Sequence, residues 1–183
     1  MLKQYLFPLK GLILLFLLVP IMAHAQKDTS KIPIPVKNRL VNYVQACTYS
    51  SPQNQTVVFN RAVKWVSGNL KGSEQGIKTK DAASGKITAT GMFKIITSDS
   101  GNYYWLRFNV LITVSDGACV LSLLNYYEKP IEKGISNEYS KIEYRWGDFR
   151  RGKPWSAEDE KLFEGLNSNS QALMESFKKA MEQ

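Results

Sequence analysis

Residues 103–124 read YYWLRFNVLITVSDGACVLSLL, and this stretch decides the fold. Asp116-Gly117 is a two-residue turn typical of β-hairpins, and apolar residues alternate with other residues on both sides of it. Counting outward from the turn places three apolar pairs on one face: Val114 with Cys119, Ile112 with Leu121, and Val110 with Leu123. Because a slip of one residue would destroy this agreement, the sequence predicts an antiparallel hairpin of defined register.

The other face of this hairpin predicts a contact surface. The same register pairs Thr113 with Val120, Leu111 with Ser122, Asn109 with Leu124 and Arg107 with Tyr126, with Tyr103 and Trp105 beyond them. A solvated face should carry less aromatic and aliphatic surface than this. We therefore expect the contact surface to consist of Tyr103, Trp105, Arg107, Leu111, Leu124 and Tyr126.

Two kinds of cover are open for this surface. One is a lid from the same chain, for which the aromatic and aliphatic candidates are Tyr139, Ile142, Tyr144, Trp146 and Phe149. The other is a ligand or a partner protein. Of the two, we expect the lid from the same chain.

The rest of the chain alternates between helical and strand-like patterns. We expect a strand over Leu40–Thr48, a helix over about Pro52–Leu70 with Ser51 as N-cap, and strands over Ile77–Asp81 and Lys86–Thr97. Residues 128–155 are predicted to be irregular, with a short strand near Lys141–Trp146. Ser156 and Asp159 form a capping box, which predicts a terminal helix over 156–181.

Several short motifs lie within this order of elements. Arg61–Val66 is followed by Asp81, by Gly85-Lys86-Ile87, by Gly91 and by Asp116-Gly117. Over about Val36–Tyr127 the chain resembles a secreted bacterial (Bacteroidetes-type) domain family of unknown function with a TATA-binding-protein-like fold. The resemblance implies an α+β fold, in which a curved antiparallel sheet of about five strands has one helix before it and one after it, packed on one face. It implies no catalytic residue.

Two glycines within these motifs have physical roles of their own. Gly85 follows turn-forming residues and is expected to take a positive φ. Gly91 lies inside a strand, which predicts either a bulge or a close approach of the helix.

The N-terminus predicts export. Lys3 and Lys10 accompany the apolar run Gly11–Met22, and Ala23-His24-Ala25 is the small-x-small pattern of a signal-peptidase site. The run is too short to span a bilayer, which needs about 20 apolar residues, so we expect no stable membrane anchor after cleavage. The expected organisation is a signal peptide over 1–25, a linker over 26–37, and a single domain over 38–183 with a family-like core over 38–127. The mature protein would be periplasmic or secreted.

Composition excludes several functions. The single histidine, His24, lies in the predicted signal peptide, so the mature protein would have no imidazole for Ser-His-Asp or Cys-His catalysis or for a His-ligated metal. Loss of Lys3 and Lys10 lowers the net charge from +8 to +6, and this dispersed charge with export argues against nucleic-acid binding.

These exclusions favour an exported, non-catalytic binding or interaction module without cofactor or metal. The expected partner is an envelope protein or an anionic or glycan ligand. The alternative is an envelope enzyme that acts on a glycan or another polyanionic substrate through carboxylates, of which Glu143 and Asp148 are candidates.

A second candidate binding segment follows the hairpin. Residues 143–155 read EYRWGDFRRGKPW, where basic and aromatic residues alternate. Such a pattern can bind a sugar, a phosphate or a base through stacking and charge, and the candidate residues are Arg145, Trp146, Arg150 and Trp155. The same pattern also suits an edge strand with solvated charges and buried rings.

The two cysteines allow two states. Cys47 and Cys119 are an even pair in a chain predicted to reach an oxidising compartment, where disulfides persist. Two buried thiols that pack as small apolar groups fit the sequence equally well.

Overall fold

The computed structural model describes residues 32–48, 54–72, 74–132, 134–135, 137–150 and 156–182, of which 148–150 are described by their backbone alone. The strands are β1 (Val36–Lys37), β2 (Leu40–Thr48), β3 (Gly76–Asp81), β4 (Lys86–Ile96), β5 (Tyr103–Ser115), β6 (Ala118–Ile131) and β7 (Ser140–Lys141). The helices are α1 (Gln55–Asn69), α2 (Ile142–Arg150) and α3 (Ala157–Met181).

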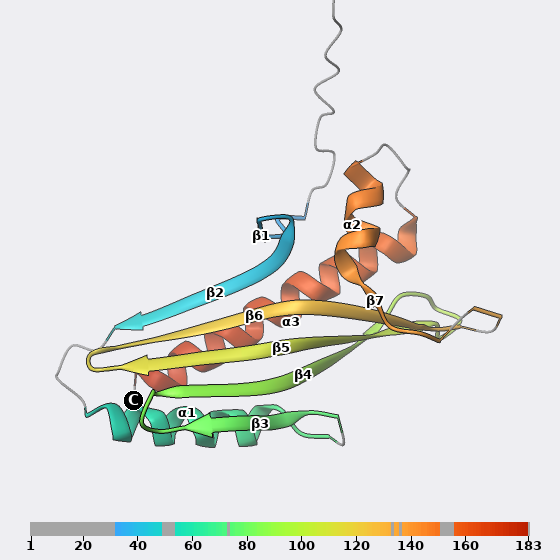
Figure 1. The fold of residues 1–183 in the computed structure, drawn as a ribbon. Helices are drawn as coiled ribbons and strands as arrows, with labels where there is room; N and C mark the ends of the chain where they lie inside the picture. The colour runs from blue at the N-terminus through green and yellow to red at the C-terminus, as the bar shows by residue number, and fades with distance from the viewer. Residues whose placement is uncertain are drawn as a thin grey trace, which may run out of the picture.

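One antiparallel sheet organises the molecule. Its order is β1-β2-β6-β5-β4-β3, and β7 pairs with β6 (Figure 1). Helices α1 and α3 both lie behind the sheet in Figure 1 and pack on the same face, and no helix among the described residues covers the opposite face. The expected α+β architecture is confirmed, and the two-residue strands β1 and β7 extend the five long strands to seven.

Amphipathic patterns explain why both helices pack on the sheet. The buried stripe of α1 consists of Val58, Phe59, Ala62, Trp65 and Val66. That of α3 includes Leu162, Phe163, Leu166, Met174 and Phe177. These stripes meet the alternate apolar residues of β4, β5 and β6, which form the core.

Of the two predicted helix starts, that of α3 is confirmed and that of α1 is wrong. The capping box of Ser156 and Asp159 is present at the start of α3, as expected. The predicted N-cap Ser51 is wrong, because α1 begins later and its N-cap is Asn54. The Asn54 side chain accepts a hydrogen bond of 2.8 Å from the backbone N–H of Thr56.

The predicted hairpin register is confirmed over most of its length. Ser115 pairs with Ala118, and the ladder continues without a shift as far as Asn109 with Leu124. There a bulge interrupts it, at Asn125, whose φ is +55°. Arg107 therefore pairs with Tyr127 and not with the predicted Tyr126.

Glycine is required at positions 85 and 91 for different structural reasons. The φ of Gly85 is +66°, as predicted. Gly91 pairs with Phe108 in a regular ladder, so the predicted bulge is wrong. The close approach also differs from the prediction, because the Phe108 ring, and not a helix, lies over Gly91.

The segment after β6 differs most from expectation. Strand β6 continues to Ile131, and the residues predicted as a strand near Lys141–Trp146 mostly belong to helix α2. Ile142 and Trp146 lie one helical turn apart and are buried, and the Trp146 ring meets that of Phe163 on α3 at 5.1 Å. Helix α2 therefore packs near the N-terminal end of α3, and does not form the predicted lid over the helix-free face.

The end of the predicted linker belongs to the fold. Ile34 is buried, the Pro35 carbonyl accepts a hydrogen bond of 3.0 Å from the backbone N–H of Asn42, and β1 pairs with β2. The prediction of a linker is thus wrong for residues 34–37. Residues 1–31, with the predicted signal peptide, lie outside the described residues. In the part of the chain that is described, no helix is long and apolar enough to cross a membrane.

Candidate functional site

We call the helix-free side of the sheet the outer face. Tyr103, Trp105 and Arg107 of β5 point to it because they alternate with the buried Tyr104, Leu106 and Phe108. The rings of Tyr103 and Trp105 are perpendicular at 5.8 Å, and the Lys94 ammonium lies 4.2 Å from the Tyr103 ring centre. The hairpin register thus placed these three β5 side chains on the correct face.

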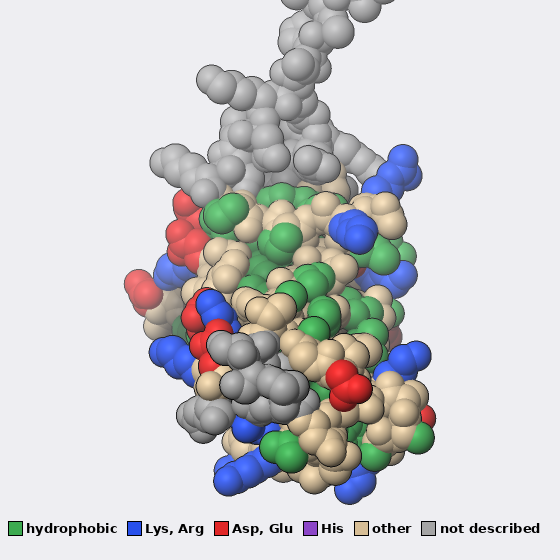
Figure 2. All heavy atoms as spheres, turned by 90° about the vertical axis from the view of Figure 1, so that its left-hand side faces the viewer, with side chains coloured by type: hydrophobic (Ala, Val, Ile, Leu, Met, Phe, Trp, Pro, Cys, Tyr) green, Lys and Arg blue, Asp and Glu red, His purple; other side chains and the backbone are tan. Residues whose placement is uncertain are grey.

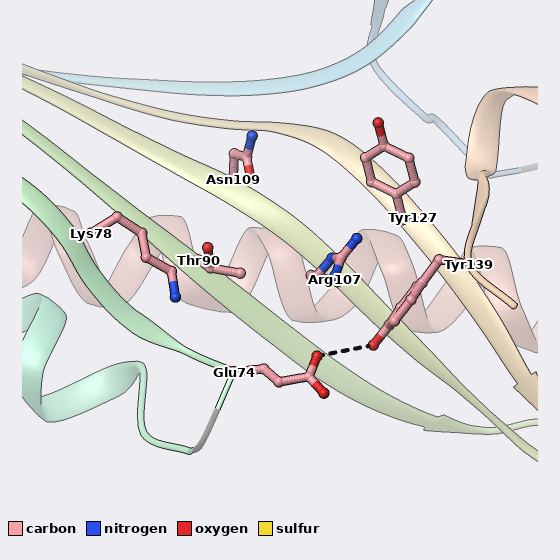
Figure 3. Close-up of a pocket in the computed structure, with 7 residues that line it drawn as sticks. All are labelled: Glu74, Lys78, Thr90, Arg107, Asn109, Tyr127 and Tyr139. Carbon is pink, nitrogen blue, oxygen red and sulfur yellow. Dashed lines mark hydrogen bonds between the residues drawn. The ribbon is translucent and has the colours of Figure 1, made fainter.

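Arg107 is the centre of the most developed part of the outer face. Its guanidinium carbon lies 4.2 Å from the ring centre of Tyr139 and 5.5 Å from that of Tyr127. Both distances are within cation–π range, so the two rings hold the guanidinium in place without neutralising its charge. In Figure 3 the guanidinium lies between these two rings.

Tyr139 is held in this position by a residue from another part of the chain. Its hydroxyl donates to the Glu74 carboxylate at 3.5 Å and also contacts the Met92 sulfur at 3.6 Å. Burial, and next the charge of Glu74, raise the pKa of Tyr139, so its hydroxyl remains a donor at neutral pH. Among the lid candidates whose side chains are described, Tyr139 alone contacts the outer-face residue Arg107.

A pocket of about 600 Å³ opens beside Arg107. It is lined by Glu74, Lys78, Thr90, Arg107, Asn109, Tyr127 and Tyr139 (Figure 3). These residues come from β3, β4, β5, β6 and the segments before β3 and β7, so tertiary structure assembles the site. Its volume is in the range of about 300–1,000 Å³ typical of small-ligand sites.

Four of the lining residues were missed by the sequence analysis. Glu74, Lys78 and Thr90 lie on or before strands whose register to β5 no turn motif determines. Tyr127 was missed because of the bulge. The doublets Leu123-Leu124 and Tyr126-Tyr127 on either side of Asn125 are the available signal, since they interrupt the alternation at a residue that tolerates positive φ.

Tyr126 is a core residue, so its predicted place on the contact surface is wrong. Its ring stacks on Phe108 at 5.3 Å and meets Tyr43 edge-on at 6.0 Å. Its hydroxyl shares a hydrogen bond of 2.8 Å with that of the buried Ser170, and burial raises the pKa of Tyr126. The bulge at Asn125 turns this side chain inward.

Arg145 and Trp146 do not join the outer face either. The Arg145 guanidinium forms ion pairs of 2.7 Å with both Glu128 and Asp159, and it also donates to the Tyr104 hydroxyl at 3.3 Å. Arg145 therefore ties α2 to β6 and to the start of α3. Trp146 is 6% exposed and packs in the core. The side chains of Arg150 and Trp155 lie outside the described residues.

The pKa values of the two carboxylates that pair with Arg145 are shifted in opposite directions. Burial raises the pKa of Glu128, and this effect outweighs the stabilisation of the carboxylate by Arg145. Burial also raises the pKa of Asp159, but hydrogen bonds from Ser156 and Arg145 outweigh it, so the net shift is downward. The carboxylate of Glu143 accepts a hydrogen bond of 2.9 Å from the Val41 backbone N–H, and the Asp148 side chain lies outside the described residues.

The outer face also carries exposed apolar side chains near the Asp116-Gly117 turn. Val44 is 54% exposed, Leu111 37% and Val120 36%, and their strands β2, β5 and β6 are neighbours. Figure 2 views the molecule from the end where this turn lies, and shows hydrophobic side chains in a band with Lys and Arg around its margin. Leu124 is partly buried in the same face.

The two cysteines lie opposite each other. Cys47 of β2 and Cys119 of β6 are direct cross-strand partners, and both are buried thiols without a disulfide between them. Burial, and next the neighbouring Cys119, raise the pKa of Cys47 to about 12. Elsewhere in the described ranges, no three His, Cys, Asp or Glu side chains are grouped so that they could hold a metal ion.

Comparison with known proteins gives a fold and a family match over part of the chain. A crystal structure of a DUF4468 family protein from Bacteroides ovatus ATCC 8483 aligns with a TM-score of 0.67 and 17% identity, over 82% of this chain and 91% of that one. A crystal structure of a TBP-like protein from Parabacteroides distasonis ATCC 8503 aligns with a TM-score of 0.63 and 14% identity, over 81% and 96%. These identities show a common fold alone.

No curated protein matches the chain. Residues 49–128 match the family model described as a domain of unknown function (DUF4468) with TBP-like fold. Over these residues the chain is similar to the DUF4468 family, as its strand, turn and glycine motifs indicated.

Proposed function

We propose that the protein is an exported, non-catalytic binding module whose outer face holds its ligand or partner. The observation that carries this proposal is the pocket beside Arg107, where two tyrosine rings hold a guanidinium that forms no ion pair with another described residue. Export rests on the signal-peptide pattern of residues 1–25.

The distribution of side chains over the two faces supports this proposal. Helices α1 and α3 bury the inner face, so folding of the described chain needs no further cover there. The outer face keeps partly exposed aromatic rings at Tyr103 and Trp105 and exposed aliphatic groups at Val44 and Leu111. Apolar groups that a monomer leaves clustered in water often mark an interaction surface.

The engagement of the carboxylates favours binding over catalysis. Glu128 is ion-paired with Arg145, and Glu143 accepts a backbone hydrogen bond from Val41. Glu74 is the one carboxylate among the described residues that line the Arg107 pocket, and it is hydrogen-bonded to Tyr139. Glycoside hydrolysis ordinarily uses two carboxyl groups that flank the scissile bond, an arrangement that these contacts do not provide.

Binding by surface variants tests the proposal. The purified protein is immobilised and exposed to cell-surface polysaccharide and envelope-protein fractions, alongside Arg107→Gln, Trp105→Ala and a control, Lys179→Gln. Lys179 is exposed on α3, away from the outer face, and its substitution changes the charge as Arg107→Gln does. Thermal unfolding checks that each variant is folded.

We expect the wild type and Lys179→Gln to retain the same material from these extracts. Both outer-face variants should bind that material at least about tenfold more weakly. The retained material should be recovered with unchanged mass, since no reaction takes place. Equal retention by all four proteins would contradict the outer face as binding surface. Cleaved material would contradict the non-catalytic assignment.

A further inference from the structure

The geometry points to a carboxylated sugar, a uronic acid unit of a glycan, as the ligand of the Arg107 pocket. This inference rests on the proposed binding role of the outer face and names the chemistry of its ligand. Three features of the pocket carry it: the side-chain donors of Arg107, which no described residue accepts, the neutral polar groups beside it, and the single carboxylate of Glu74.

The guanidinium of Arg107 is available to an acceptor from a ligand. No hydrogen bond or ion pair joins its guanidinium to another residue in the described part of the chain, and its contacts are with the rings of Tyr127 and Tyr139. A guanidinium has five N–H donors, which ring faces do not satisfy. It binds carboxylates bidentately, and a fixed guanidinium loses less rotational freedom when it does so.

The remaining lining groups suit hydroxyl groups. Thr90, Asn109 and Tyr127 provide hydroxyl and amide groups that both donate and accept hydrogen bonds. None of the seven lining residues is Val, Leu, Ile, Met or Phe, so the larger apolar groups of this pocket are the rings of Tyr127 and Tyr139, on which a sugar ring can stack. A ligand with many hydroxyls would satisfy these groups, which is the chemistry of a sugar.

Glu74 limits the charge density of the ligand. Lys78 and Arg107 attract an anion, whereas the Glu74 carboxylate lies in the same pocket and repels one. A dense polyanion such as a nucleic acid or polyphosphate would place several negative charges near Glu74. A sugar with one carboxylate can direct that group to Arg107 and donate hydroxyl hydrogen bonds to Glu74.

A matched pair of ligands tests this inference. Isothermal titration calorimetry measures binding of a galacturonic acid trimer and of a galactose trimer, in which a hydroxymethyl group replaces each carboxylate. A sulfated galactose trimer is included, so that carboxylate and sulfate are distinguished. The proteins are the wild type, Arg107→Gln, Lys78→Gln and the helix control Lys179→Gln.

We expect the wild type and Lys179→Gln to bind the acidic trimer at least about tenfold more tightly than the neutral one, as a charge-assisted bidentate contact allows. Arg107→Gln should remove this preference, and Lys78→Gln should reduce it. Added salt should weaken binding of the acidic trimer more than binding of the neutral trimer. Unchanged thermal midpoints would show that both outer-face variants remain folded.

Each contrary result overturns the inference in a recognisable way. Equal binding of the two trimers, or binding of neither, excludes a carboxylated sugar. Tighter binding of the sulfated trimer than of the carboxylated one would show that the pocket binds a sulfate group and not a carboxylate. If no trimer binds, but retention of the cell-surface and envelope fractions still depends on Trp105 and Arg107, the inferred ligand class is wrong and the outer face remains the binding surface. If both assays fail, the proposed function fails as well.

Discussion

Substitution of Gly91 by alanine should destabilise the protein, because the core has no room for the added methyl group. A Cβ at this position would lie 2.3 Å from Cζ of Phe108, far inside contact distance. The Phe108 ring is fully buried, with Phe93 at 4.5 Å and Tyr126 at 5.3 Å, so it cannot move without displacing them. Overpacking of this kind costs about 1–3 kcal/mol.

The expected net effect follows from two opposing contributions. Because an added Cβ would lie within 2.4 Å of two Phe108 ring atoms, we expect an overpacking cost at the upper end of this range, about 3 kcal/mol. Alanine restricts the unfolded chain more than glycine does and returns about 0.5–1 kcal/mol, so the expected net loss from the free energy of unfolding is about 2 kcal/mol. For a domain of this size the melting temperature should fall by about 4–8 °C. Urea unfolding of Gly91→Ala measures the loss directly.

Two further variants make this test specific. Gly68 lies in α1 with no atom within 4 Å of an added Cβ, so Gly68→Ala should stabilise by about 0.5–1 kcal/mol. Combining Gly91→Ala with Phe108→Leu should cost less than the sum of the two single changes, because the smaller side chain vacates the contested space. Additive losses, or a Gly91→Ala variant as stable as Gly68→Ala, would refute the steric argument.

Three other predictions concern acid stability, the cysteines and export. The pKa of Asp159 is lower in the folded than in the unfolded state, so its ionisation stabilises the fold above about pH 4 and this contribution is lost as the pH falls. The difference in unfolding free energy between wild type and Asp159→Asn should narrow from about pH 6 to about pH 3, and a constant difference would contradict this. Cys47 and Cys119 should resist alkylation in the native protein and react in denaturant without reductant, because both are buried thiols and the pKa of Cys47 is about 12. Intact mass decides this, and failure to react in denaturant would indicate a disulfide. Mass analysis of the exported form should show Gln26 as the first residue, and a form that retains Lys3 would contradict cleavage.

The sequence predicted the part of the sheet where local chemistry fixes the register. The Asp116-Gly117 turn and the apolar alternation determine each pair as far as Asn109 with Leu124. The prediction failed at the bulge, because one residue of positive φ at Asn125 reverses the faces of all that follow. Tyr126 and Tyr127 exchange roles for this reason alone.

Helix α2 and the site were harder to predict, because both depend on tertiary contacts. The residues after Lys141 are rich in aromatics, which suits a strand, but burial of Ile142 and Trp146 and the ion pairs of Arg145 stabilise a helix. The pocket requires the positions of β3 and β4 and of the segment that carries Tyr139. No two-residue turn fixes the register of these elements to β5, so the sequence indicated Arg107 but not most of its surroundings.

Amide chemical shifts of the protein, recorded by NMR during titration with the retained ligand fraction, test the outer face most directly as the binding surface. We predict that the largest changes lie on neighbouring strands around the pocket, at Thr90, Arg107 and Tyr127. The exposed residues of α1 and α3, on the opposite side of the sheet, should change little. Changes confined to those helices, with β4, β5 and β6 unaffected, would contradict the account.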